Sequence, residues 1–244
     1  MVIPIAYNIL RNPKRWDDKV FHDRIEAWYW SALFSGIFRE RQNENAILEL
    51  KLLTKCLEAD PDAANQIKNR QSKVLSVVGY SDRDTLLLKD QDSAISSDVS
   101  YAILQYVLSL GPTDFDPEDS SKLFAWQDVE LEDHHIVPLA QASTLRASAA
   151  QLRSMGDDFI LNSPLNRTLI SKHANRAIGS KSPAQYWSEL TADKPASHLL
   201  PGTSAVYNIA PGDKWEAQVR SFLEERFQRL HEKLQEELAI LMSS

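Results

Sequence analysis

The sequence predicts a mainly α-helical protein with a small α+β insertion and a long C-terminal helix. Apolar residues recur every three or four positions over most of the first 110 residues, an acidic stretch breaks this pattern, and a second long apolar stripe runs from 215 to 241. We expect three parts: a helical domain over 1–110, a small core over 111–200, and a C-terminal amphipathic helix within 201–244 that packs on the core.

Composition limits the class of protein. The chain has 244 residues, a hydrophobic fraction of 43%, and 27 Lys plus Arg against 34 Asp plus Glu, which gives a net charge of −7. Enough apolar residues are present to bury a core, and the single cysteine excludes an internal disulfide framework. With no run of 18 apolar residues and no signal-peptide pattern, we expect a cytoplasmic protein with no membrane partner. The acidic balance argues against passive coating of nucleic acid, although positive charge can be concentrated locally.

Apolar stripes and helix-end signals define the helices expected before residue 111. Pro61 ends one helix, because the residue before a proline disfavours helical backbone. Gly111 and Pro112 end another, since glycine favours the position after a helix and proline cannot continue one. The helices expected from these signals cover 16–38, 45–59, 63–73 and 97–110.

Charge changes sign between two later segments. Residues 112–133 contain eight acidic residues and one lysine, and we expect an acidic linker that leads into a short strand over 126–131. Residues 160–188 contain no acidic residue and four basic ones: Arg167, Lys172, Arg176 and Lys181. A net-acidic protein thus concentrates positive charge in this segment.

Two helices are expected toward the C-terminus. Ser182, Pro183 and Gln185 form the pattern of a capping box with proline at the first helical position, which opens a short helix to Leu190. The apolar stripe over 215–241 indicates an amphipathic helix with a charged outer face.

Two adjacent histidines, His134 and His135, are the first sign of chemistry. Consecutive side chains of a strand point to opposite sides, so such a pair at a strand end can direct one imidazole to a metal and the other to substrate. On its own the pair is weak evidence. Downstream, Asn166 and Asn175 stand nine residues apart, at the start of a short strand and in a following helical turn. Asparagine is depleted in strands and middling in helices, so both positions are locally unfavourable.

Asp-His-His-Ile-Val-Pro from Asp133, together with Asn166 and Asn175, resembles the ββα-metal fingerprint of the HNH (His-Asn-His) endonucleases, in the variant that ends on asparagine. Residues 100–235 are similar in more detail to the C-terminal nuclease domain of Gmr-type modification-dependent restriction enzymes and related phage-defence effectors. The resemblance implies a nuclease core within 111–200 and a metal-dependent DNA endonuclease of prokaryotic restriction or anti-phage defence. It also implies a nucleotide-hydrolysing sensing domain or subunit, N-terminal or separate, for which this sequence shows no phosphate-binding signature.

The resemblance implies a role for each motif residue. His135 would be the general base that deprotonates the attacking water, and Asn166 would hold the loop that carries it. His134 and Asn175 would bind the metal, with Mg²⁺ the first choice and Mn²⁺ the second, because the other ligands would be water and phosphate oxygens. The basic residues that would contact DNA phosphates are Arg167, Lys172, Arg176 and Lys181. The products would carry 5′-phosphate and 3′-hydroxyl ends.

Alternatives remain for individual residues. Asp133 could bind the metal in place of His134. His173 lies two positions from Asn175, and on a helix such positions diverge by about 200°, so the two cannot both face the metal; the spacing favours Asn175. His198 is expected to have a structural hydrogen-bonding role.

A second hypothesis for the whole chain is a non-catalytic adaptor that binds an NTPase partner or nucleic acid. The adaptor hypothesis is opposed by the presence of all four motif residues, His134, His135, Asn166 and Asn175. A chain that had lost catalysis would be expected to accumulate substitutions at these positions. A hydrolase that uses serine and histidine without a metal ranks last, since the chain has no Gly-x-Ser-x-Gly elbow.

Overall fold

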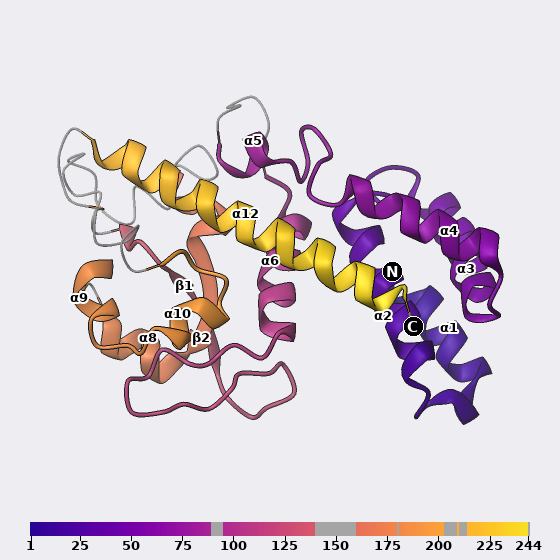
Figure 1. Ribbon diagram of the computed structural model, residues 1–244, viewed down its shortest axis with the longest axis horizontal. Helices are drawn as coiled ribbons and strands as arrows, with labels where there is room; N and C mark the ends of the chain where they lie inside the picture. The colour runs from indigo at the N-terminus through magenta and orange to yellow at the C-terminus, as the bar shows by residue number, and fades with distance from the viewer. Residues whose placement is uncertain (89–94, 140–159, 180, 203–208, 210–213, 244) are drawn as a thin grey trace. The chain divides into compact units, whose positions relative to one another are not determined.

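The computed structural model describes residues 1–88, 95–139, 160–179, 181–202, 209 and 214–243 (Figure 1). Over these residues the protein is mainly α-helical and has one two-stranded antiparallel sheet, as the sequence predicts. None of the helices in this part of the chain has the length and apolar character needed to cross a bilayer. The backbone divides into two units, Met1–Asp82 with His231–Ser244, and Arg83–Leu230.

These units differ from the predicted segments 1–110, 111–200 and 201–244. Helix α6 (Ser97–Ser109) packs against strand β2 (Arg167–Ser171) and the 3-10 helix η6 (Pro164–Asn166), so it belongs to the second unit. Helix α12 (Trp215–Leu241) begins in the second unit, and from His231 onward it belongs to the first. Periodicity along the chain locates a helix but does not say which elements it packs against.

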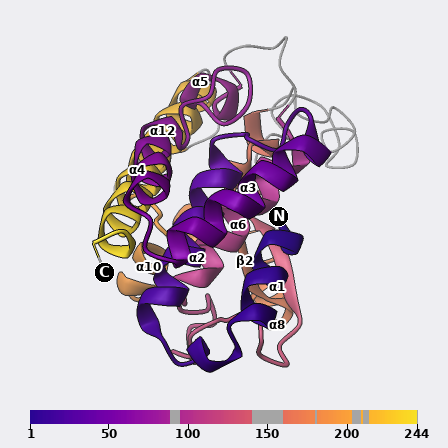
Figure 2. The same cartoon turned by 90° about the vertical axis from the view of Figure 1, so that its right-hand side faces the viewer.

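The first unit is a set of packed helices. Its elements before residue 83 are α1 (Val2–Arg11), η1 (Pro13–Arg15), α2 (Lys19–Phe34), α3 (Gln42–Leu57), α4 (Pro61–Arg70) and η2 (Gln71–Lys73). Helix α3 lies beside α1, α2 and α4 (Figure 2). The apolar faces of α2, α3 and α4 share a core in which Trp28, Leu53 and Ile67 are fully buried. This burial is the main source of stability in the unit.

One buried carboxylate joins three of these helices. Glu49 of α3 accepts a hydrogen bond from Trp28 Nε1 of α2 at 2.7 Å. The guanidinium of Arg70 at the end of α4 donates to both carboxylate oxygens of Glu49, at 2.6 and 2.9 Å. Because this bidentate pair and the indole satisfy the carboxylate, its charge can be buried in the core.

The second unit contains the sheet. Its elements are α5 (Arg83–Leu86), α6, β1 (Leu131–His135), η5 (Ile160–Asn162), η6, β2, α8 (Lys172–Ile178), α9 (Pro183–Trp187), α10 (Asp193–Ser197) and the first part of α12. Strand β1 pairs antiparallel with β2, so that His134 lies opposite Thr168 and His135 opposite Arg167. Helix α8 follows β2 directly, because the Ser171 side chain caps it by accepting the Ala174 N–H. The helix packs on both strands.

The strand predicted over 126–131 is wrong in its position. Residues 124–127 form a turn in which Gln127 N–H donates to the Phe124 carbonyl, and Phe124 N–H donates to the Gln127 side chain at 3.0 Å. Strand β1 begins at Leu131, which lies opposite Ser171 of β2. The start of the strand is therefore set by its distant partner and not by local β-propensity.

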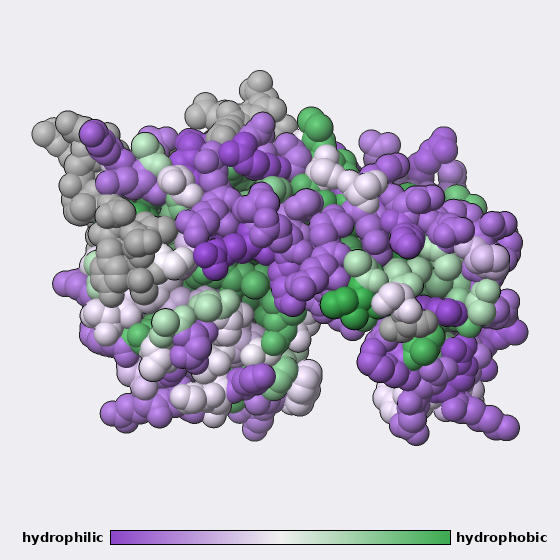
Figure 3. Space-filling model, in the orientation of Figure 1, coloured by the Kyte–Doolittle hydropathy of each residue, from purple (hydrophilic) through white to green (hydrophobic). Residues whose placement is uncertain are grey.

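The C-terminal helices follow their predicted patterns. The capping box is present, since Ser182 accepts the Gln185 N–H and the Gln185 side chain accepts the Ser182 N–H, although α9 ends at Trp187 instead of Leu190. Helix α12 buries most of its apolar residues, including Phe222 and Leu234, while Ile240 is exposed. Hydrophilic side chains cover most of its outward face (Figure 3), which is the amphipathic arrangement that its sequence predicts.

Candidate active site

The two faces of β1 carry different partners. Alternation along the strand puts Glu132 and His134 on one face and Asp133 and His135 on the other. The first pair meets Asn175 of α8. On the other face, Asp133 meets Arg167 of β2. The structure thus joins His134 and Asn175, which the sequence predicts as metal ligands, and separates them from Asp133.

His134 is held in a buried, neutral form. Its side chain is almost fully buried against Phe115 and Tyr186, and its Nδ1 lies 2.8 Å from Asn175 Oδ1. Burial lowers the pKa of His134 to about 4, and the contact with Asn175 opposes this shift. Its Nε2 is buried with no hydrogen-bond partner among the described residues. At neutral pH the imidazole is uncharged, which is the form that a metal ligand needs.

Asn175 uses both ends of its amide. Its Oδ1 faces His134, and its Nδ2 donates to Glu132 Oε2 at 2.6 Å. This second bond fixes which end of the amide points to His134. Sequence reasoning missed Glu132, although its place two residues before His134 puts both on the same strand face.

The His134–Asn175 pair offers an imidazole nitrogen and an amide oxygen, two ligand types that divalent cations accept in proteins. Because Asn175 Nδ2 is bound to Glu132, its Oδ1 accepts a hydrogen bond from Nδ1–H of the neutral His134 at 2.8 Å. A cation held by both atoms would have to displace this proton. His173 lies away from the pair, since its exposed imidazole is 3.5 Å from Asp116 Oδ2. The arrangement agrees with the choice of Asn175 over His173.

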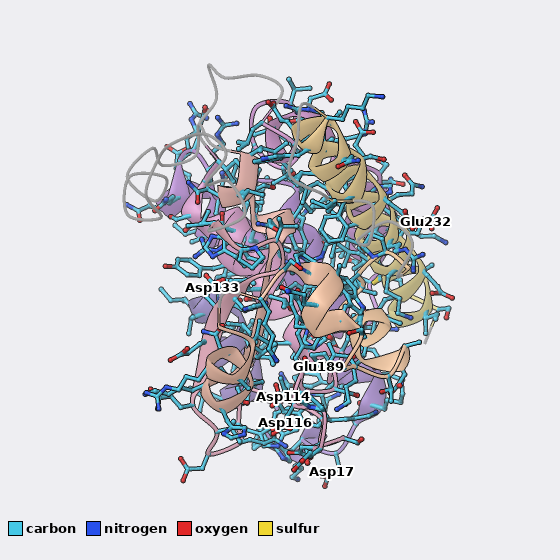
Figure 4. The ribbon with its side chains drawn as sticks, turned by 90° about the vertical axis from the view of Figure 1, so that its left-hand side faces the viewer. Asp17, Asp114, Asp116, Asp133, Glu189 and Glu232 are labelled. Carbon is cyan, nitrogen blue, oxygen red and sulfur yellow. The ribbon has the colours of Figure 1, made fainter. Side chains whose placement is uncertain are left out.

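Asp133 does not reach this pair. Its carboxylate binds Arg167 through two contacts, Nε to Oδ1 at 3.0 Å and Nη2 to Oδ2 at 2.6 Å. Burial raises the pKa of Asp133, and the Arg167 guanidinium opposes the shift. In Figure 4 Asp133 is labelled on β1, while Asp114 and Asp116 lie in the segment before it. The alternative in which Asp133 replaces His134 as a ligand has no support in this geometry.

The backbone just after His135 is tightly held. Asn166 is fully buried, and its side chain accepts the Val137 N–H at 2.9 Å and donates to the carbonyls of Val137 and Leu161, at 3.0 and 2.8 Å. Its own carbonyl accepts the Ile136 N–H at 2.8 Å. The Tyr186 hydroxyl donates to the Ile136 carbonyl at 2.7 Å. These bonds fix the chain that leaves His135, which is the role predicted for Asn166.

His198 is buried on the same side of the sheet as His134 and has a bridging position. Its Nδ1 lies 2.7 Å from Thr168 Oγ1, and its Nε2 lies 2.9 Å from the Thr113 carbonyl. Burial lowers the pKa of His198 to about 3, and the bond to Thr113 opposes the shift. The neutral ring therefore links the acidic linker to β2, in agreement with the predicted structural role.

The acidic linker is also tied to the site by Asp114. This buried carboxylate accepts the Ser171 N–H at 3.0 Å, at the junction of β2 and α8. Lys194 of α10, which is also buried, donates to the carbonyls of Asp116 and Asp119. These contacts give part of the linker a fixed conformation.

Stability is expected to fall below pH 6.5 by about 1.4 kcal/mol per pH unit for each of His134 and His198. In the unfolded chain both imidazoles take up a proton near pH 6.5, whereas in the folded chain they stay neutral down to about pH 4 and about pH 3. The unfolded state thus binds more protons as the pH falls, and above pH 6.5 the contribution is constant. Urea unfolding at pH 7, 6 and 5 measures the slope. In a His198→Asn variant the contribution of His198 is absent, so the free energy of unfolding should fall less steeply with pH than in wild type. An equal slope in both proteins would show that His198 is not a neutral, buried histidine in the folded chain.

Three of the four predicted phosphate-binding cations are in ion pairs. Besides the Arg167–Asp133 pair, Lys172 lies 2.6 Å from Glu130. Lys181 lies 2.9 Å from Glu189. Within the described part of the chain, Arg176 is exposed and forms no ion pair. DNA would have to compete with carboxylates for the paired cations. Asp133 and Glu130 lie 34 and 42 residues from their partners along the chain, and Glu189 lies just beyond the basic segment, 8 residues from Lys181.

Comparisons with known proteins leave the family open. No protein-family model matches the chain, and no solved structure matches it significantly. The uncharacterized protein MJ0686 of Methanocaldococcus jannaschii is 25% identical over 169 residues, which are 69% of this chain. The chain spans about a quarter of the length of that relative. Because the relative is itself uncharacterized, its similarity assigns no activity.

Proposed function

We propose that this protein is a metal-dependent DNA endonuclease with an HNH-type ββα-metal core, acting in prokaryotic restriction or anti-phage defence. One observation carries the proposal. The four residues of the sequence motif meet in one β-β-α unit, where His134 contacts Asn175 and Asn166 holds the backbone next to His135. Motif residues without a shared function would have no reason to converge in this way.

The residues divide the chemistry between them. His134 and Asn175 would hold Mg²⁺ or Mn²⁺, and the cation would supply Lewis-acid stabilisation of charge on the phosphate oxygens. His135, at the end of β1, would take the proton from the attacking water. Asn166 would keep the imidazole of His135 in its working direction through the backbone of Val137. Arg176 would hold a neighbouring phosphate without reading sequence.

The proposal is tested by cleavage of supercoiled plasmid with the purified chain at low salt. Nicking or linearisation is expected with Mg²⁺ or Mn²⁺ and should stop when EDTA is added. A preparation of the His135→Ala variant made in parallel excludes a contaminating nuclease. A folded chain that binds DNA but cleaves none, with either metal and in the presence of its partner, would favour the non-catalytic adaptor.

We also expect a partner that brings the nuclease to its target. The chain is acidic overall, and most of its predicted phosphate-binding cations are paired with carboxylates. Its own binding to DNA should therefore be weak and strongly dependent on salt. The resemblance to restriction effectors suggests that a nucleotide-hydrolysing sensing domain or subunit supplies recruitment. The greater length of the archaeal relative leaves room for such a domain in that protein.

Replacing Asp133 by asparagine is expected to tighten DNA binding roughly threefold at low salt. The change removes the carboxylate that pairs with Arg167 and leaves the guanidinium available to phosphate. If Arg167 gains one phosphate contact, the slope of log affinity against log salt should steepen by about 0.9. Fluorescence anisotropy with labelled duplex, in a His135→Ala background, measures both values.

The matched control is Glu216→Gln, which makes the same change in net charge and releases Arg220, a residue that is not among the predicted DNA contacts. An equal gain in affinity for both variants would mean that net charge alone is responsible. In that case Arg167 would not be a phosphate contact.

A further inference from the structure

Helix α12 sends one charged side chain into the interior of the second unit. Arg226 is 2% exposed. Its Nη1 donates to the carbonyls of Leu165 and Arg167 at 2.6 and 2.8 Å, and its Nη2 donates to the His198 carbonyl at 3.4 Å. The first two carbonyls belong to the residues on either side of Asn166. A single guanidinium thus holds the backbone on both sides of that asparagine.

The choice of arginine at this place needs a reason. Burial lowers the pKa of Arg226 to about 9, so the side chain still carries its charge at neutral pH. Among the described residues no carboxylate forms an ion pair with it. A buried charge without a counter-charge is costly, and an apolar side chain would pack here at lower cost. An apolar residue has no donors, and a lysine has a single nitrogen, whereas the planar guanidinium reaches the carbonyls of residues 165, 167 and 198 from two nitrogens.

The contacts form a chain that leads to the candidate base. Arg226 binds the carbonyls around Asn166, the Asn166 side chain binds the N–H and carbonyl of Val137, and Val137 lies two residues after His135. A shift of the backbone at residues 165–167 would turn the Asn166 amide away from Val137. The backbone after His135 would then lose two of its hydrogen bonds.

We propose that Arg226 is a positioning residue for His135, which acts by fixing the backbone on both sides of Asn166. The inference rests on the proposed nuclease function for its catalytic consequence, but its structural part can be measured separately. The spacing along α12 places Arg226 on the same stripe as the buried Phe222 and Leu230, so an arginine on this apolar face is the sequence signal for a buried role.

The test uses Arg226→Met, which keeps much of the length and removes all donors, and Arg226→Lys, which keeps the charge and loses the planar guanidinium. Hydrogen exchange of the Val137 amide is expected to become at least tenfold faster in both variants. Amides of α6, which has no bond to Arg226, should keep their protection. The matched control is Arg220→Met, on the same helix, whose guanidinium binds the Leu87 carbonyl and should leave Val137 unchanged.

Plasmid cleavage gives the catalytic readout. Both Arg226 variants should lose at least tenfold in kcat, with KM for DNA within about threefold of wild type, because Arg226 touches no part of the substrate. Unchanged exchange at Val137 would overturn the proposal, as would loss of protection throughout α6, which would make Arg226 a residue of general stability. If exchange at Val137 is faster in the Arg226 variants but the wild-type protein never cleaves DNA, the role of Arg226 in positioning the loop is supported and the nuclease function is rejected.

Discussion

Alanine at position 135 is expected to slow metal-dependent cleavage of plasmid DNA by at least about a hundredfold, because a general base contributes this much or more to proton transfer. The fold should be retained. The backbone around residue 135 is held by Asn166 and Tyr186, whose bonds go to Ile136 and Val137 and do not involve the His135 side chain. Initial cleavage rates at saturating Mg²⁺, together with thermal unfolding of each protein, separate loss of chemistry from loss of structure.

The matched control for this prediction is His173→Ala. His173 lies in the same motif region, but its imidazole is 80% exposed and faces Asp116. Its removal should leave the cleavage rate within about twofold of wild type, since surface substitutions away from a site have small effects. Full activity of His135→Ala, or loss of activity in His173→Ala alone, would show that His135 is not the general base.

Alanine at position 166 is expected to lower the free energy of unfolding by about 3 kcal/mol or more. The substitution leaves three backbone groups without their side-chain partner: the N–H of Val137, the carbonyl of Val137 and the carbonyl of Leu161. Each buried polar group left unpaired costs about 1–3 kcal/mol. Asn166 is fully buried, so water can replace these bonds only if the loop opens. Denaturant unfolding at neutral pH measures the loss.

Aspartate at position 166 is the informative companion. It keeps an oxygen to accept the Val137 N–H but has no donor for the two carbonyls, and it places a negative charge beside them. Its loss of stability should therefore be at least as large as that of alanine, and cleavage should be lost in both variants. A change of less than about 1 kcal/mol in Asn166→Ala would show that the loop does not depend on this side chain.

The pairing of the predicted DNA contacts has a consequence for the proposed binding of DNA. Arg167, Lys172 and Lys181 each bind a carboxylate, so the positive segment 160–188 is largely neutralised in the free protein. The Lys181–Glu189 pair is exposed and contributes little to stability, whereas the Arg167–Asp133 pair is half-buried. Under the proposed function, these cations would exchange partners when a DNA phosphate arrives, and the carboxylates would lower the affinity of the surface for DNA.

The sequence by itself determined the helical character of the chain and the position of the motif residues within it. The stripes that predict α2, α3, α6 and α12 are local, because burial of one helix face is visible in spacings of three and four residues. The capping box at Ser182 is local as well. Alternation along a strand is also local, and it correctly placed His134 and His135 on different sides of β1.

Tertiary structure alone decided the rest, because it depends on partners far apart in the chain. The start of β1 is fixed by pairing with β2, and the partner of Asp133 on its face of the strand is Arg167 of β2. Glu132 joins the site through Asn175, 43 residues away, and Arg226 reaches Asn166 from the C-terminal helix. A hydrogen bond between distant residues leaves no periodic trace in the sequence, so the spacing of the motif could identify the candidate site but could not show what holds it in place.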